Sequence, residues 1–291
     1  MHRRAGKEAA KAVGLAALAA LMLAPFIAPL LPRGGGESVN IKEIPELLSR
    51  AVALLNSSTL GLAKSVRGGD PVDVEEEAEE LAKALARLSE EDLGEGALAE
   101  KLYRALPSYA SLAEAAYRAS RASKLIKEAY PSLREALDAA VRCDPDEAAK
   151  AWEKARDAVE KARKELTLAS LALASVDPDS LVSERHEEIY ETACEVVEEV
   201  LASLLEVSKA LDLVSKYQDD YRSLCAGGEA CTGLKEGLAS LRPCRAGPFA
   251  YEVGVIRGRA LGELSPCRGS GTGSSSGRGG GAGRVEPPSD D

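Results

Sequence analysis

The chain has 291 residues and a formal net charge of −10, and its length suits one large domain or two small ones. Phosphate contacts dominate nucleic-acid affinity and an acidic chain repels phosphate, so the charge argues against DNA or RNA as a partner. Only 4% of the residues are aromatic, so the core must consist mainly of Ala, Leu and Val, a composition that favours helices over strands.

Amide side chains are scarce, since the chain contains two Asn, Asn40 and Asn56, and one Gln, Gln218. Depletion of these thermolabile residues beside abundant charge is typical of proteins from thermophiles. Compositional drift in a GC-rich genome would produce the same depletion, so thermophily is one of two interpretations.

The N-terminal segment predicts a membrane anchor. No charged residue lies between Lys11 and Arg33, and the 20 residues 12–31 are predominantly apolar, about the length that crosses a bilayer. Basic residues before this stretch predict that the N-terminus stays in the cytoplasm. We therefore interpret residues 1–36 as a retained signal anchor, a single-pass membrane helix that places the body outside the cytoplasm. A cleaved signal peptide, which would give a secreted protein, and a buried soluble helix are the alternatives.

Five segments between residues 37 and 225 carry apolar and small residues at alternating spacings of three and four. These segments are 41–62, 74–88, 98–140, 148–176 and 189–214. The period predicts helices whose apolar stripes pack in near-parallel, coiled-coil-like seams. We expect an all-α fold, an elongated antiparallel bundle of about five helices that follows the N-terminal transmembrane or signal helix. The last segment carries two adjacent stripes, which predicts a position near the centre of the bundle.

Prolines and their neighbours predict where these helices begin and bend. Asp70, Asp144 and Asp177 each precede a proline, the arrangement of an N-cap acid before the first helical residue. Pro107 and Pro131 lie inside the third segment, which predicts a kinked or split helix.

The pattern changes after residue 225. Residues 226–267 are richer in Gly and Pro, and we expect a short helix near 234–241. The stretch 249–264 is compatible with a helix or with a pair of strands. We interpret 226–267 as a Cys-containing C-terminal cap, and the Gly/Ser-rich residues 268–291 as a disordered tail.

The chain contains six cysteines, an even number that indicates disulfides in an exported protein. If the last two long segments form a hairpin, Cys194 lies about 25 Å from Cys143 at 1.5 Å per residue, beyond the roughly 7 Å between Cα atoms that a bridge allows. The geometry therefore predicts that Cys194 is a free, buried thiol. The candidates for two disulfides are Cys225, Cys231, Cys244 and Cys267.

Residues with catalytic or metal-binding chemistry are few. His186 is the one His of the body and lies among Glu184, Glu187, Glu188 and Glu191. A mononuclear metal site is conceivable there, but a surface His in an acidic helix start is the favoured interpretation. The paired E-x-x-H motifs of di-iron bundles, P-loops, dinucleotide fingerprints and nucleophile elbows are all absent from the sequence. We therefore expect no catalytic residues, no metal and no cofactor.

Asn56 begins the sequence Asn-Ser-Ser, an N-glycosylation motif that has meaning in an exported chain.

Together these features predict a membrane-anchored or exported, non-enzymatic scaffold or interaction module of the cell surface, with a protein or envelope component as partner. A ligand-sensing or solute-binding bundle is the alternative, and an enzyme is the third class. A pocket lined by convergent polar groups would favour the ligand-binding class, whereas an exposed apolar patch would favour the interaction module.

Overall fold

The computed structural model describes residues 43–88, 96–242 and 247–262, and every regular element in these ranges is helical. The prediction of an all-α fold is thus confirmed, with more helices than the five expected. The elements are α2 (Ile44–Ser65), α3 (Glu75–Arg87), α5 (Ala97–Val141), α6 (Pro145–Ala174), the short 3-10 helix η2 (Pro178–Ser180), α7 (Glu184–Lys216), α8 (Gln218–Cys225), α9 (Thr232–Ala239) and α10 (Ala250–Leu261).

The predicted anchor, residues 12–31, lies outside the described residues, as do the tail and parts of the cap. Among the helices that the structure does describe, none combines the length and the apolarity that crossing a membrane requires.

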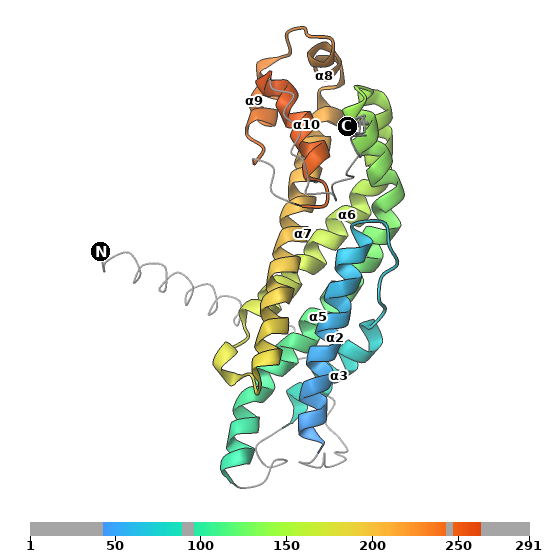
Figure 1. Cartoon of the computed structure of the whole chain (residues 1–291). Helices are drawn as coiled ribbons and strands as arrows, with labels where there is room; N and C mark the ends of the chain where they lie inside the picture. The colour runs from blue at the N-terminus through green and yellow to red at the C-terminus, as the bar shows by residue number, and fades with distance from the viewer. Residues whose placement is uncertain (1–42, 89–95, 243–246, 263–291) are drawn as a thin grey trace, which may run out of the picture.

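The long helices lie side by side and give the body an elongated shape (Figure 1). Helix α5 has 45 residues and at 1.5 Å per residue spans about 68 Å. Helices α2, α5 and α7 all begin toward one end of the body, and α8, α9 and α10 gather at the other end (Figure 1). We call these the α2 end and the cap end.

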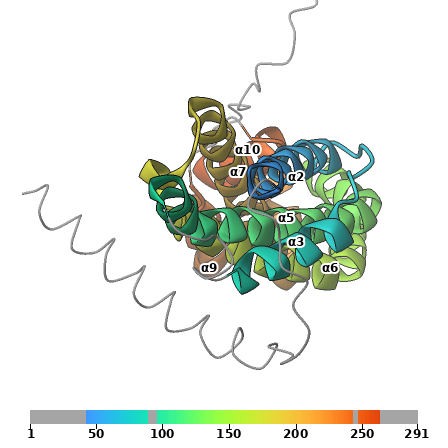
Figure 2. The same ribbon diagram turned by 90° about the horizontal axis from the view of Figure 1, so that it is seen from below.

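Helix α5, not α7, is the centre of the bundle. It packs against α2, α3, α6, α7 and α10, and the view along the body places it between α2 and α7 on one side and α3 on the other (Figure 2). The prediction that α7 lies near the centre was wrong in that α5 takes this place, although α7 does pack against more than one helix, α2 and α6 among them. Three residues of the second stripe of α7, Tyr190, Cys194 and Leu201, are only half-buried, whereas α5 buries adjacent positions such as Leu112 and Ala113 completely.

The seam predicted for α6 is present. All nine of its stripe positions are buried, namely Ala148, Trp152, Ala155, Val159, Ala162, Leu166, Ala169, Leu173 and Val176. Alanine alternates with larger residues along this stripe, and small side chains let a neighbouring helix approach closely. The extensive packing of α6 against α5 follows from this alternation.

The N-caps were predicted correctly at two of three positions, Asp144 and Asp177. The carboxylate of Asp144 accepts a hydrogen bond from the backbone N–H of Glu147 at 3.0 Å and caps α6. Asp177 caps only the short η2, and α7 begins after Ser183. Asp70 caps no helix, because residues 70–74 have no regular secondary structure and α3 begins only at Glu75.

Helix α5 is one continuous helix that contains both Pro107 and Pro131, so the split that these prolines suggested does not occur. Each proline removes one backbone hydrogen bond. Buried neighbours, including Leu106 and Leu133, hold the helix in the core on either side and offset that loss.

The cap helices share the core of the bundle. Helix α10 packs against α9, α5 and α7, and Leu234, Phe249 and Ile256 belong to the same buried cluster as the long helices. The stretch that the sequence left ambiguous, 249–264, is therefore helical from Ala250 to Leu261.

Candidate functional site

The sole histidine of the body faces the core. His186 is half-buried, and its Nδ1 lies 2.7 Å from the hydroxyl of Tyr109, a hydrogen-bond distance. The same hydroxyl accepts from the backbone N–H of Val182 at 2.9 Å. Burial, aided by the charge of Arg185, lowers the pKa of His186, so the ring is neutral at pH 7. These contacts tie the start of α7 to α5 and give His186 a structural role.

The glutamates around His186 point into solvent. Glu184, Glu187, Glu188 and Glu191 are all exposed, and the described part of the chain contains no group of three or more His, Cys, Asp or Glu side chains that could hold a metal ion. The structure therefore does not bring His186 and these carboxylates together as a ligand set.

A disulfide at the cap end joins Cys143 to Cys225, with 5.8 Å between the two Cα atoms. Cys225 was a predicted disulfide cysteine, but its pairing within the C-terminal group was wrong, because α8 brings Cys225 back to the turn between α5 and α6. Cys194 is a half-buried free thiol and Cys231 an exposed one among the described residues. Cys244 and Cys267 lie outside them, so a bridge that involves these two stays a prediction.

The free thiol of Cys194 lies in a protected position. Burial raises its pKa, which keeps it protonated at neutral pH and unreactive. Burial also raises the pKa of the neighbouring Tyr190 to about 12, and the Tyr190 hydroxyl donates to the carbonyl of Leu173 at 3.3 Å. Neither group is prepared as a nucleophile or base.

Beside the disulfide, a polar cluster caps the C-terminal end of α5. The Arg259 guanidinium donates to the carbonyls of Ala140 and Val141 at 3.0 and 2.8 Å. It also donates to the Tyr221 hydroxyl at 2.8 Å, and that hydroxyl donates to Ala140 O at 2.8 Å. Carbonyls at a helix end lack partners within the helix, so this cluster satisfies them and fastens α8 and α10 to α5.

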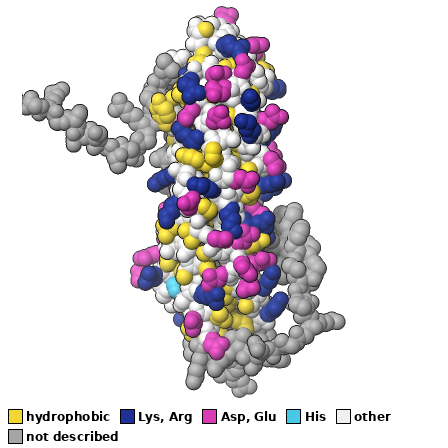
Figure 3. All heavy atoms as spheres, turned by 90° about the vertical axis from the view of Figure 1, so that its right-hand side faces the viewer, with side chains coloured by type: hydrophobic (Ala, Val, Ile, Leu, Met, Phe, Trp, Pro, Cys, Tyr) yellow, Lys and Arg dark blue, Asp and Glu magenta, His cyan; other side chains and the backbone are white. Residues whose placement is uncertain are grey.

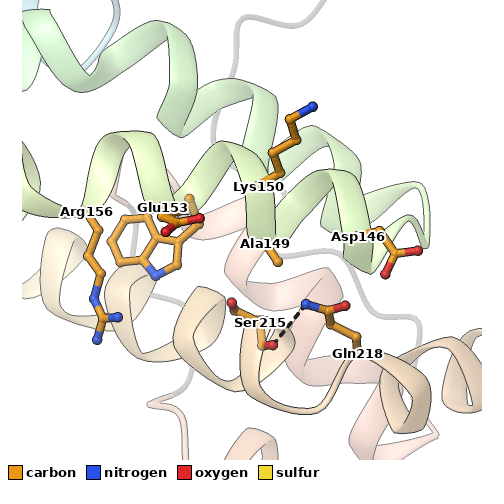
Figure 4. A pocket seen from close by; sticks show the side chains of 8 residues that line it. Asp146, Ala149, Lys150, Glu153, Arg156, Ser215 and Gln218 are labelled. Atoms are coloured by element: carbon orange, nitrogen blue, oxygen red, sulfur yellow. Dashed lines mark hydrogen bonds between the residues drawn. The ribbon is translucent and has the colours of Figure 1, made fainter.

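A cleft of about 470 Å³ opens between α6, α7 and the start of α8 (Figure 4). Its lining consists of Asp146, Ala149, Lys150, Trp152, Glu153, Arg156, Ser215 and Gln218. Gln218 and Ser215 face Ala149 across the cleft, whereas Lys150 points away from them (Figure 4).

Most of the polar groups of the cleft already have partners within the protein. Trp152 donates its indole N–H to Asp212 at 2.9 Å, and Arg156 lies 3.3 Å from the same carboxylate oxygen. Asp146 pairs with Arg222 at 2.7 Å, and Gln218 donates to the carbonyl of Ser215 at 3.2 Å. The cleft can therefore admit a small polar solute but offers no buried, unpaired charge to select one.

Sequence reasoning did not single out the cleft, because it depends on the register between two antiparallel helices. The signal that exists is weak: Trp152 and Arg156 are four residues apart and so share one face of α6. Nothing in the sequence indicates that Asp212 of α7 lies opposite them.

The residues of the predicted glycosylation motif lie on two different faces of α2. The Asn56 side chain is exposed, but the Ser58 hydroxyl is buried and donates to the carbonyl of Leu55 at 2.9 Å. Glycosylation of Asn56 stays a prediction.

Comparison with known proteins gives no further guide to the function, because no family model, no curated protein and no solved structure matches the chain.

Proposed function

We propose that this protein is a membrane-anchored or exported helical module of the cell surface or envelope, which acts as a non-enzymatic scaffold or interaction partner. The observation that carries the proposal is the arrangement of the body. An elongated bundle begins at the α2 end, directly after the predicted anchor, and its linked cap lies at the opposite end (Figure 1). Such an arrangement suits a rod that projects from a membrane and presents its sides to partners.

The packing inside the rod supports a role as a rigid spacer. A single helix, α5, runs through it, and the disulfide and the Arg259 cluster fasten the cap to the end of that helix. Disulfides persist in oxidising compartments outside the cytoplasm, and a bridge between Cys143 and Cys225 agrees with an exported body.

The topology is tested by a reporter that is active only in the cytoplasm, fused after Asp291 of the full chain. We expect no reporter activity, because the basic residues before residue 12 keep the N-terminus inside. A second fusion, made after Lys11, gives the matched control and should be active. Activity of both fusions would refute the proposed location.

The interaction is tested by site-specific photo-crosslinking of the full chain in its own cells. The probe replaces Leu60 or Tyr251, whose side chains are 52% and 48% exposed, and the buried Leu112 is the control position. We expect discrete crosslinked species from at least one exposed position and none from the control. Crosslinking from none of the exposed positions along the rod would contradict the scaffold proposal.

A ligand-binding bundle is the second candidate, and the cleft beside α8 is the observation that favours it. The chain contains one Trp, and Trp152 lines this cleft, so a bound solute would change the fluorescence of the protein. Titration with amino acids, sugars and small carboxylates is the test. A saturable change that Ser215→Phe abolishes by filling the cleft would favour the ligand-binding class over the scaffold.

A further inference from the structure

The N-terminal half of α7 carries an unbalanced negative charge. Seven glutamates occupy its solvent side, namely Glu184, Glu187, Glu188, Glu191, Glu195, Glu198 and Glu199, and all are exposed. The one basic residue in this stretch is Arg185. None of the seven glutamates forms an ion pair with another residue of the described ranges, and we call them the acidic face of α7.

Many charges elsewhere on the bundle are paired. Arg118 of α5 pairs with Glu114 at 2.7 Å and with Glu165 at 3.1 Å, and Lys124 pairs with Asp73 and Glu75 at 2.8 and 2.9 Å. On the side of the body seen in Figure 3, basic and acidic side chains intermingle along the whole length. The acidic face of α7 differs from these sites, because seven exposed glutamates of one helix have no ion-pair partner among the described residues.

The stability of α7 does not account for these glutamates. Acids in the first turn, such as Glu184 and Glu187, interact favourably with the helix dipole, but this effect ends within that turn. Glu187, Glu191, Glu195 and Glu199 follow one another at intervals of four, and like charges at this spacing destabilise a helix. A basic partner would remove that repulsion.

An apolar stripe runs beside the acidic face. Tyr190, Cys194 and Leu201 are half-buried, and Leu205 is 39% exposed; the four define the apolar stripe of α7. Three glutamates lie three residues before members of the stripe, which makes them neighbours on the helix surface. These neighbouring pairs are Glu187 with Tyr190, Glu191 with Cys194, and Glu198 with Leu201.

We infer that this half of α7 is a docking surface for a basic amphipathic helix of another protein. The apolar stripe of the partner would lie against that of α7, and lysines or arginines flanking it would meet the acidic face, as in helix-in-groove recognition. The inference rests on the function proposed above and names the chemistry of the partner.

Charge excludes the obvious other occupants. A symmetric contact with a second copy would place one acidic face against another. An anionic lipid surface attracts basic segments, not acidic ones, and the phosphates of nucleic acids are repelled in the same way. A basic helix is the occupant that the face complements.

The test uses the full chain in a neutral detergent and two fluorescent peptides of identical Leu/Lys composition, each of about 18 residues or five turns. One peptide is amphipathic as a helix and the other is scrambled so that it has no apolar face. Binding is followed by fluorescence anisotropy at low and high salt. The protein variants are Glu187→Gln/Glu191→Gln/Glu198→Gln and Leu205→Ser.

We expect the amphipathic peptide to bind at least about tenfold more tightly than the scrambled one, with an affinity that falls as salt rises. The triple variant should weaken binding about tenfold and Leu205→Ser severalfold, since surface pairs and one exposed side chain each contribute modestly. The matched control, Glu76→Gln/Glu80→Gln/Glu135→Gln, removes three exposed glutamates of α3 and α5 and should leave binding unchanged.

Equal binding of both peptides, no binding, or an equal loss in the control variant overturns the inference. If it fails while photo-crosslinks from Leu60 or Tyr251 persist, the interaction module stands and its contact surface lies elsewhere. If the crosslinks also fail, the proposed function falls with it.

Discussion

Removal of the Cys143–Cys225 disulfide should measurably destabilise the bundle. The two cysteines are separated by 82 residues, and closing a loop of that length is worth about 4.5 kcal/mol in the chain-entropy model, while removing native bridges typically costs about 2–5 kcal/mol. We expect Cys143→Ala/Cys225→Ala to lower the free energy of unfolding by about 3–4 kcal/mol. Because each kcal/mol shifts the midpoint of a domain of this size by about 2–4 °C, thermal unfolding should move down by about 10 °C.

The backbone at Cys143 adds a second, independent expectation. Cys143 has φ 70°, and its turn makes hydrogen bonds from Cys143 N to Ala140 O and from Asp144 N to Ala139 O, at 3.2 and 2.9 Å. This is the helix-ending turn in which glycine usually holds the left-handed position. Since a side chain costs about 1 kcal/mol there, Cys143→Gly/Cys225→Ala should be about 1 kcal/mol more stable than Cys143→Ala/Cys225→Ala.

Urea denaturation followed by circular dichroism at 222 nm, the helix band, measures both effects. The exposed Cys231→Ser serves as the control and should unfold like the wild type. The reasoning is refuted if the variant without the bridge unfolds at the wild-type midpoint. The expectation for the backbone at position 143 is refuted if Cys143→Gly/Cys225→Ala is no more stable than Cys143→Ala/Cys225→Ala.

Three further changes test other parts of the structure. Burial lowers the pKa of His186 in the folded protein, so the unfolded chain binds a proton at this residue more readily than the folded one. The free energy of unfolding should therefore fall as the pH drops below the ordinary His pKa of 6.5, and His186→Gln should reduce that fall. Gly61→Ala would place a Cβ 2.7 Å from the backbone N of Val72, and the clash should exceed the gain in helix propensity and destabilise the bundle by about 1–2 kcal/mol. Arg134→Met would leave the buried Glu252 carboxylate without its ion-pair partner, at a cost of about 2–3 kcal/mol.

Each of these changes has its own control and measurement. The pH series compares His186→Gln with the wild type at each pH, and parallel curves would contradict the His186 assignment. Gly233→Ala, where the added Cβ meets only the end of the Tyr217 side chain at 3.2 Å, should be milder than Gly61→Ala in the same urea titration. Glu252→Gln, which can still accept a hydrogen bond from Arg134, should lower the stability less than Arg134→Met does. The reverse order would show that Glu252 does not need Arg134 as its partner.

The cysteines show most clearly what could not be predicted from the sequence alone. The hairpin register that separates Cys143 from Cys194 also places Cys143 opposite about residue 211, at equal distances along two antiparallel helices. A continuation of the chain past that point could therefore return to Cys143. The sequence does not show this, because α8 and its direction depend on the burial of Tyr221 against the end of α5.

The sequence by itself determined that the five long segments are helical, because the 3.6-residue period and the choice of Ala and Leu are local properties that each of them carries. It also determined the buried seam of α6 and the cap at Asp144, which depend on neighbours within a few residues. Only the tertiary structure decided that α5 is the central helix and that Cys143 and Cys225 meet. It also decided that the seven glutamates in the N-terminal half of α7 have no ion-pair partner among the described residues. These features depend on contacts between residues far apart in the chain, and local periodicity does not specify which apolar stripe faces which.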